Sequence, residues 1–509
     1  MRSRRPLRGT RSSSSSSTCC CWATCCPHRA AGIDSTAHRQ HDCPVTSARP
    51  SSLGELRQSG YIPRSVKQEL RDNLIGRLRS GKPLFPTIVG YEETVIPQIE
   101  NAILSGQDIV FLGERGQAKT RMARLLVDLL DEVVPALVGS EIHDDPLAPI
   151  SAAGRALVAE QGDKAPITWI PRDRRYGEKL ATPDITIADL IGEVDPIKVA
   201  EGRYLADELT IHYGLLPRTH RGIFAINELP DLAERIQVGL LNIMEERDVQ
   251  IRGYKVRLPL DLFVVASANP EDYTNRGRII TPLKDRFGSQ IRTHYPRRVA
   301  DEMAIMEAER TRFGADGIET RAAEYMKLVV AELTHLARRA PEISQRSGVS
   351  VRVSICNYEN LLSSALKRAI RLKEASAAPR VTDLEAIAAS TTGKIEMETA
   401  GDAAEDKILG KLAQKAVLNV FNRSFTGSEL DEVVLAFQGG LTVEVSDDMP
   451  SADYVRQIGE LRPILAALKK LGAQDAASTA AALEFVLEGL HLSRKLNKDV
   501  KAGQTRYRS

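Results

Sequence analysis

Short apolar runs alternate with longer stretches of helical character between Pro86 and about Pro296. The strongest of these runs are Asp108–Leu112, Gly222–Ile226 and Leu262–Ser267. Strands that alternate with helices along a chain are typical of a parallel sheet with helices on its faces. We therefore expect residues 86–296 to form an α/β core that is built on a parallel sheet.

The segments around this core have a different pattern. Residues 53–85 are polar and helical and end at prolines, which predicts a helical lead-in. Residues 297–390 lose the strand pattern and are rich in Ala, Leu, Glu and Arg, which predicts a smaller, all-helical domain. Residues 391–509 predict a further C-terminal helical region, with one strand-like run at Leu441–Val445.

The leader, residues 1–52, is of low complexity and holds little that could form a core, so we expect it to be disordered. Its first 50 residues carry eight Arg, two Asp and no Lys, a charge of +6, which leaves −4 for the rest against a total of +2. The body is therefore mildly acidic, and this charge balance does not favour a nucleic-acid partner.

Three further interpretations of the leader stay open. It could be an organelle transit peptide, because it is rich in Arg and Ser and poor in acidic residues. It could reflect a start site assigned too early. It could also hold zinc, although the spacing is irregular, through Cys21, Cys25, His28, His38, His41 and Cys43.

The positions of the cysteines and the lengths of the apolar runs indicate where in the cell the protein is expected to be found. Of the seven cysteines, Cys356 is the one in the body, so no disulfide framework can form there and a reducing, cytoplasmic location is expected. No run approaches the roughly 18 consecutive apolar residues that cross a bilayer, so no membrane span is expected.

The first strand leads into a phosphate-binding loop. Its residues are Gly113, Glu114, Arg115, Gly116, Gln117, Ala118, Lys119 and Thr120. A strand that turns through glycines into a helix directs backbone N–H groups at one point, where the phosphates of ATP can sit. Lys119 would reach the β and γ phosphates, and the Thr120 hydroxyl would hold Mg²⁺.

Ala118 occupies a position where this loop pattern has Gly. The alanine would be tolerated if its backbone already has helical dihedrals, since only a positive φ strictly needs glycine. The alternative for the whole run is a chance glycine turn.

The second strand, Gly222–Ile226, ends in Asn227 and Glu228. Polar groups at the carboxyl ends of parallel strands lie beside the phosphate loop. Asn227 would contact the magnesium ion through water without bringing a charge, and Glu228 would act as the general base on the attacking water. The alternative is a buried strand that ends in a helix cap.

Three more polar residues complete the predicted site. Asn269 follows the third strand and could orient the attacking water or contact the γ phosphate, unless it only caps a turn. Arg286 could reach the ATP of a neighbouring subunit, where a guanidinium can contribute on the order of 10³ in rate, with Arg276 and Arg278 as weaker candidates. Arg352 opens a helix of the helical domain and could reach the phosphates of its own subunit.

The order of these motifs resembles the AAA+ superfamily over about Pro86 to Ile370. The runs Tyr213–Ile223 and Leu240–Arg247, the second followed by Val249–Gly253, are similar to those of magnesium chelatase I subunits and of the clade that also contains MoxR-type ATPases and replicative helicases. The segment Ile88, Val89, Gly90 and Tyr91 resembles the adenine-contacting segment of the family.

This resemblance implies an ATPase that works as a homo-oligomeric ring, often of six subunits, with ATP at each interface, residues 297–390 as a helical lid, and a partner that carries a von Willebrand A domain. It would drive metal insertion, as in chelatases, or remodel a partner protein, as in MoxR-type systems. Two alternatives stay open: a nucleotide-dependent scaffold with weak hydrolysis, and a DNA-acting motor. The acidic body disfavours the latter.

Overall fold

The computed structural model describes residues 49–194, 208–246, 248–251, 254–269, 277–313, 317–344, 348–397, 402–459, 461–501 and 504–509. The leader up to residue 48, with its zinc candidates, lies outside this range, as does Arg276. Among the helices described, none is both long and apolar enough to cross a membrane.

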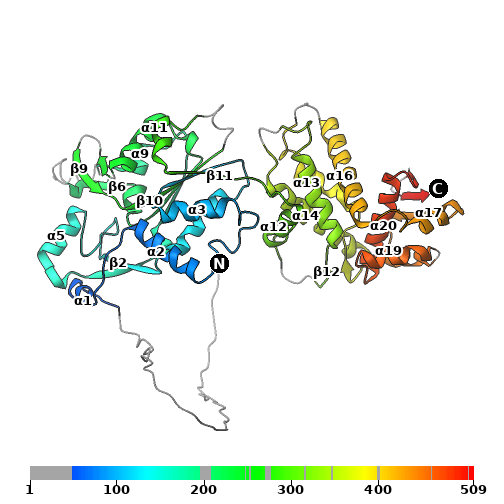
Figure 1. Ribbon diagram of the computed structural model, residues 1–509, viewed down its shortest axis with the longest axis horizontal. Helices are drawn as coiled ribbons and strands as arrows, with labels where there is room; N and C mark the ends of the chain where they lie inside the picture. The colour runs from blue at the N-terminus through cyan, green and yellow to red at the C-terminus, as the bar shows by residue number, and fades with distance from the viewer. Residues whose placement is uncertain are drawn as a thin grey trace, which may run out of the picture. The chain divides into compact units, whose positions relative to one another are not determined.

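A five-stranded parallel sheet is the centre of the α/β core (Figure 1). Its strands, in spatial order, are β11 Ser289–Arg292, β1 Ile109–Leu112, β10 Leu262–Ala268, β7 Gly222–Asn227 and β4 Tyr176–Leu180. All neighbours pair in parallel. The predicted fold class and the three predicted strands are therefore confirmed, and the carboxyl ends of β1, β10 and β7 lie at one edge of the sheet.

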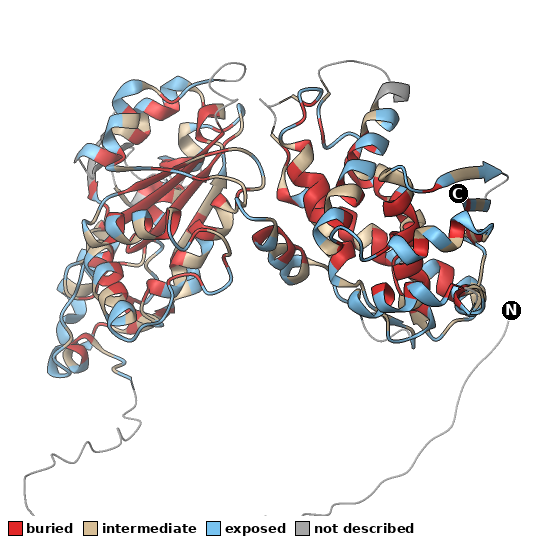
Figure 2. Cartoon of the chain, turned by 45° about the vertical axis from the view of Figure 1, so that its right-hand side comes forward, coloured by how far each residue is buried: buried red, intermediate tan, exposed pale blue. Residues whose placement is uncertain are grey.

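Helices cover both faces of this sheet because successive strand residues point to opposite sides. On one face, Phe111, Ile223 and Phe263 pack in a buried cluster with α2 Val66–Arg79 and α3 Val95–Leu104. On the other face, the adjacent residues Val110, Phe224 and Val264 pack with α9 Glu234–Glu246 and α11 Thr281–Arg286. Figure 2 shows the strands as the most continuously buried part of the core. Burial on both faces explains why the strands are apolar throughout.

The remaining elements of the core surround the sheet. The lead-in contributes α1 Leu53–Gln58 as well as α2, so its predicted helical character is confirmed. The strands β8 and β9 pair antiparallel and lie between α9 and β10 in the chain. The other elements are α4 Lys119–Leu125, β2 Val133–Leu137, α5 Ala152–Gln161, β3 Ile167–Pro171, α6 Ile187–Leu190, β5 Gly192–Val194, β6 Ile211–Tyr213, α8 Leu215–Arg218, β8 Asp248–Ile251 and β9 Tyr254–Pro259.

A buried ion pair attaches the lead-in helix α2 to the start of β4. Both guanidinium nitrogens of Arg175 donate to the Glu69 carboxylate, at 2.8 and 2.6 Å, and both side chains are almost fully buried. Arg175 Nε also donates to the carbonyl of Arg221, at the start of β7. Arg175 therefore links α2 to the residues that precede β4 and β7, and removal of either partner of the pair would leave an uncompensated buried charge.

The chain after the sheet is mostly helical, as predicted. Its helices are α12 Val299–Glu309, α13 Glu324–Ala337, α14 Val351–Leu372, α15 Ala388–Thr391, α16 Asp402–Ser424, α17 Asp431–Gln438, α18 Ser451–Ile458, α19 Leu465–Lys470 and α20 Ala476–Leu492. One hydrophobic cluster runs from Met303 in α12 to Tyr507 near the C-terminus. The boundary proposed at residue 390 stays a prediction.

The described part of this helical region also contains two small sheets. The predicted strand-like run forms β14 Val443–Ser446, which pairs with a hairpin of β15 Asn497–Lys501 and β16 Gln504–Arg508. The hairpin was not predicted, because its residues are largely polar and Tyr507 alone among them is buried. Two-residue strands, β12 Glu319–Thr320 and β13 Ser376–Ala377, also pair.

The turn between β1 and α4 differs from the prediction at one residue. Ala118 has φ of 56° and ψ of 16°, which is left-handed and not helical. The condition under which alanine would fit this position without strain, helical dihedrals, is therefore not met. A left-handed conformation costs a residue with a Cβ about 1–2 kcal/mol, so the loop keeps its shape against a local strain.

Replacing Ala118 by Gly should remove this strain. We expect the free energy of unfolding of Ala118→Gly to rise by up to about 1 kcal/mol, because relief of the left-handed strain exceeds the added entropy of the unfolded chain. Chemical denaturation without nucleotide measures it. The matched control is Ala123→Gly in the helical part of α4, which should lose about 1 kcal/mol. Equal losses in the two variants would contradict the explanation.

Candidate functional site

Three turns at the carboxyl edge of the sheet bring the predicted catalytic residues together. Lys119 follows β1, Glu228 follows β7 and Asn269 follows β10. Lys119 Nζ donates to Asn269 Oδ1 at 2.5 Å, and Asn269 Nδ2 donates to Glu228 Oε2 at 2.5 Å. One hydrogen-bonded chain therefore joins three residues that are far apart in the sequence.

The phosphate loop holds the Lys119 ammonium group in place. The carbonyl of Glu114 accepts from Lys119 Nζ at 2.9 Å, and the carbonyl of Gly113 accepts from it as well. A Cβ on Gly113 would lie 2.0 Å from Thr293 Oγ1, and one on Gly116 would lie 2.0 Å from Ser350 Oγ. The two glycines are therefore needed for close packing around the loop.

A large cavity of about 1020 Å³ opens above the loop. Predicted residues that line it come from the loop, from the strand ends and from α14; they are Arg115, Gly116, Gln117, Ala118, Lys119, Thr120, Glu228, Asn269 and Arg352. A smaller cavity of about 70 Å³ adjoins the same loop and is lined by Ile88, Val89 and Tyr91. Gly90 lies between Val89 and Tyr91 in the same segment and has a positive φ of 85°.

Thr120 and Asn227, the two residues predicted to hold magnesium, are in contact. Thr120 Oγ1 donates to Asn227 Oδ1 at 3.0 Å, and Ser267 Oγ donates to the same oxygen at 3.2 Å. Within the residues described, no group of three or more His, Cys, Asp or Glu side chains could hold a metal ion by itself. Mg²⁺ prefers oxygen ligands and usually takes several from water and nucleotide phosphates. A hydroxyl and an amide oxygen beside a phosphate loop fit that mode of binding.

Glu228 has a strained backbone. Its φ of 55° and ψ of 46° are left-handed, and its backbone N–H donates to Ser267 Oγ at 3.3 Å. Residues held in this region often belong to functional sites, where the surrounding structure maintains them. Because Asn269 donates to one carboxylate oxygen of Glu228, the side chain has a defined direction at the cavity wall.

Sequence reasoning missed an ion pair beside the metal site. Glu178 on β4 accepts from Asn227 Nδ2 at 2.7 Å, and from Nε and a terminal nitrogen of Arg124 at 2.7 and 2.9 Å. Partial burial acts to raise the pKa of Glu178. The hydrogen bonds and the charge of Arg124, together with the hydrogen bond from Asn227, outweigh burial and lower the pKa of Glu178. No motif marks Glu178; the pairing of β4 with β7 brings it to the site.

Arg286 does not reach this cavity in its own subunit. It is the last residue of α11, its side chain is 36% exposed, and it donates to Glu245 at 2.7 Å and to Asp285 at 3.3 Å. Arg278 lies in the segment before α11, where its carbonyl accepts from Gln237. Neither arginine lines the cavity described above, whereas Arg352 does.

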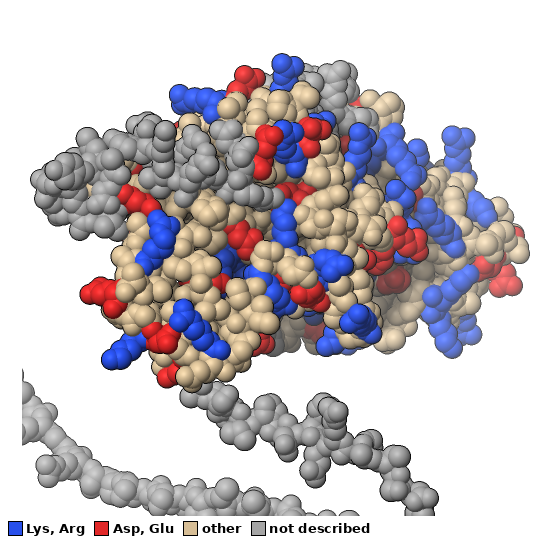
Figure 3. Space-filling view, turned by 60° about the vertical axis from the view of Figure 1, so that its left-hand side comes forward, with Lys and Arg blue, Asp and Glu red and all other residues tan. Residues whose placement is uncertain are grey.

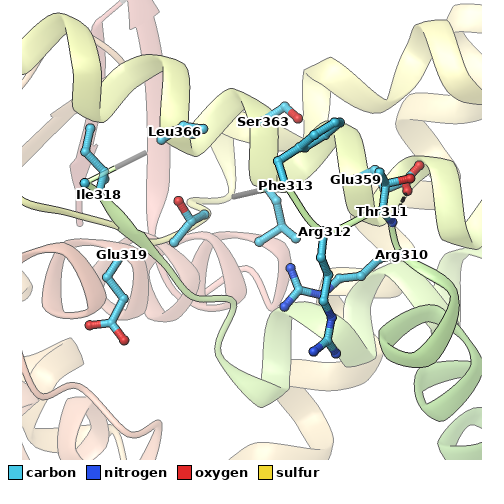
Figure 4. A pocket seen from close by; sticks show the side chains of 12 residues that line it. Arg310, Thr311, Arg312, Phe313, Ile318, Glu319, Glu359, Ser363 and Leu366 are labelled. Carbon is cyan, nitrogen blue, oxygen red and sulfur yellow. Dashed lines mark hydrogen bonds between the residues drawn. The ribbon is translucent and has the colours of Figure 1, made fainter. Parts of the chain in front are cut away.

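A separate cavity of about 680 Å³ lies in the helical region (Figure 4). Arg310, Arg312 and Phe313 line it together with residues of α14 such as Ser363. Arg310 and Arg312 both contact Glu307, so their charges are partly balanced. None of the predicted site residues lines this cavity.

Curated relatives of this chain include subunits of magnesium chelatase. The magnesium-chelatase subunit ChlI of Oryza sativa subsp. japonica chloroplasts is 28% identical over 273 residues, which is 50% of this chain and 59% of that protein. The subunit ChlI of Nostoc sp. is 28% identical over 229 residues, 44% of this chain and 57% of that protein. The chain therefore spans less than two thirds of the length of these relatives.

The comparison with solved structures gives matches of low structural similarity. A solved complex between subunits BchI and BchD of magnesium chelatase aligns at 20% identity and a TM-score of 0.33, and covers 64% of this chain and 99% of the matched chain. No protein-family model matches the chain. The curated relatives and the order of the motifs agree that this chain is similar to the magnesium chelatase I subunits of the AAA+ superfamily.

Proposed function

We propose that this protein binds ATP and hydrolyses it as the motor subunit of an AAA+ assembly. The observation that carries the proposal is the chain of hydrogen bonds from Lys119 through Asn269 to Glu228 at the wall of a cavity above the phosphate loop. In this proposal Lys119 is the cation for the phosphates, Asn269 is the polar amide and Glu228 is the carboxylate base. These are the groups that phosphoryl transfer to water requires.

In this proposal the triphosphate lies on the loop from Gly113 to Thr120, where the backbone N–H groups and Lys119 contact its oxygens. Bound magnesium neutralises charge on the β and γ phosphates, and Thr120 and Asn227 would hold it. Glu228 accepts a proton from a water molecule as the water oxygen bonds to the γ phosphorus. The bond from that phosphorus to the bridging oxygen breaks, and ADP leaves with the electron pair.

Asn269 would keep Glu228 ready for this step. Its amide donates to Glu228 Oε2, which gives the carboxylate a defined direction at the cavity wall. The other end of the same amide accepts from Lys119. Asn269 therefore separates the lysine from the glutamate, which would otherwise be drawn into a direct ion pair.

The larger assembly is also a proposal. A homo-oligomeric ring, of six subunits as in the resembled family, is supported by Arg286, which is exposed and does not line the cavity of its own subunit. A partner with a von Willebrand A domain, coupling to metal insertion or to remodelling of a partner protein, and a cytoplasmic location follow from the resemblance and from the cysteine pattern. Of these two activities, metal insertion is favoured by the names of the curated relatives.

Specific observations bear on the two other candidate functions. The strained Ala118 and the uncharged Asn227 favour a nucleotide-dependent scaffold with weak hydrolysis. A DNA-acting motor would need a basic surface stripe. On the face in Figure 3, Lys and Arg side chains are interspersed with Asp and Glu, which gives no support to that function.

Replacing Glu228 by Gln should abolish turnover and leave binding intact. The amide cannot accept the proton of the attacking water, so we expect ATP hydrolysis to fall about 10²–10⁴-fold. Phosphate release measures turnover, and a fluorescent ATP analogue measures binding. Glu160→Gln, which changes an exposed glutamate of α5, should behave as the wild type. Equal turnover in Glu228→Gln and the wild type would refute the assigned base, and a wild type without turnover would favour the scaffold.

Mixing two inactive variants tests whether Arg286 acts on a neighbouring subunit. Arg286→Ala and Glu228→Gln should each be inactive alone. In mixed rings, some sites combine the intact Glu228 of one subunit with the intact Arg286 of the next, so part of the ATPase activity should return. Arg456→Ala, at an exposed arginine of α18, is the matched control and should be active alone. Mixtures that stay inactive, although mixed oligomers form, would contradict action in trans.

A further inference from the structure

The metal site contains a neutral amide where a carboxylate is usual, and a carboxylate lies directly behind it. Asn227 ends β7, and Glu178 projects from the neighbouring strand β4 with Oε1 at 2.7 Å from Asn227 Nδ2. The strands pair in parallel, with Leu180 opposite Asn227. The negative charge is therefore present beside the site, but on the next strand.

The direction of these hydrogen bonds fixes the orientation of the Asn227 amide. An ionised carboxylate can only accept hydrogen bonds, so the NH₂ group of Asn227 has to face Glu178. The amide oxygen then has to face the other way, toward Thr120 Oγ1 at 3.0 Å and Ser267 Oγ at 3.2 Å. Without Glu178 the amide could turn over and present its NH₂ group to the metal side, where it would repel a cation.

Arg124 keeps Glu178 in this position. Two nitrogens of its guanidinium donate to the two carboxylate oxygens of Glu178, and the side chains are 63% and 21% exposed respectively. Arg124 lies on α4, the helix that begins with Lys119 and Thr120. The pair therefore connects β4 to α4, the helix that carries the predicted phosphate-binding residues. Glu178 on β4 contacts the amide nitrogen of Asn227, and Thr120 on α4 contacts its amide oxygen.

We propose that Glu178 is a positioning residue for the magnesium ion that accompanies ATP. It holds the Asn227 amide oxygen toward the Thr120 hydroxyl and brings, from the adjacent strand, a carboxylate whose charge Arg124 partly balances. The inference rests on the proposed function, because it concerns the metal of the same nucleotide site. It deepens that function by identifying which residues make the site selective for the magnesium complex of the nucleotide.

A purely structural role for Glu178 makes a different prediction. An ion pair that only joins β4 to α4 would affect nucleotide binding equally with and without metal. A positioning role affects nucleotide binding when magnesium is present and leaves nucleotide binding without the metal unchanged. The ratio of the two affinities, and not either affinity by itself, separates the two roles.

The experiment measures, by calorimetry, binding of a non-hydrolysable ATP analogue to the full chain in excess magnesium and in EDTA. For Glu178→Gln we expect the ratio of the two affinities to fall about 10-fold, as is usual when a group behind a metal ligand is changed. Affinity in EDTA should stay within about 2-fold of the wild type. Glu444→Gln, which removes a glutamate paired with Arg506 in the C-terminal sheet, is the matched control and should keep the wild-type ratio.

A second substitution tests where the charge is needed. In the Glu178→Gln background, Asn227→Asp returns a carboxylate to the end of β7 and should restore the ratio. In the wild-type background the same change places two carboxylates in contact. The ratio of the affinities in magnesium and in EDTA should therefore rise less there than in the Glu178→Gln background. An unchanged ratio in Glu178→Gln, or equal losses in magnesium and EDTA, would overturn the proposal. A wild type that binds the analogue in neither condition would instead refute the proposed function itself.

Discussion

The parallel pairing of β4, β7, β10 and β1 is the constraint on which the whole site depends. The pairing continues beyond the strands: Gly113 N–H donates to the carbonyl of Ala268 at 3.1 Å, and Ala181 N–H donates to that of Asn227 at 2.8 Å. These hydrogen bonds fix the position, along the strand direction, at which each loop with a polar site residue begins. A shift of one strand by one residue would reverse its side chains and remove a site residue from the cavity.

Two left-handed residues show that this arrangement is maintained against local preference. Ala118 and Glu228 have φ of 56° and 55°; Ala118 directly precedes Lys119, and Glu228 ends the hydrogen-bonded chain that begins at Lys119. Such strain persists only where the surrounding packing determines the conformation. The packing here comes from the buried clusters on both faces of the sheet and from the Glu69–Arg175 ion pair that holds β4.

The sequence allowed prediction of those features that have a local physical signature. Continuous apolar runs predicted β1, β7 and β10, and their polar endings predicted that Lys119, Glu228 and Asn269 would meet. The left-handed φ of Ala118 could not be predicted, because alanine normally avoids it. Glu178 was missed because its role arises from its position on a neighbouring strand, and the β15–β16 hairpin because it buries a single large side chain. The roles of the site residues and the domain boundaries remain predictions.

The most direct measurement is a structure of the protein with magnesium and a non-hydrolysable ATP analogue. We predict that the triphosphate lies on the turn from Gly113 to Thr120, with Lys119 at the γ phosphate and the metal next to Thr120 and Asn227. Glu228 and Asn269 should face a water molecule in line with the bond to be broken. A nucleotide bound elsewhere, or phosphates that lie away from Lys119 and Glu228, would contradict the account.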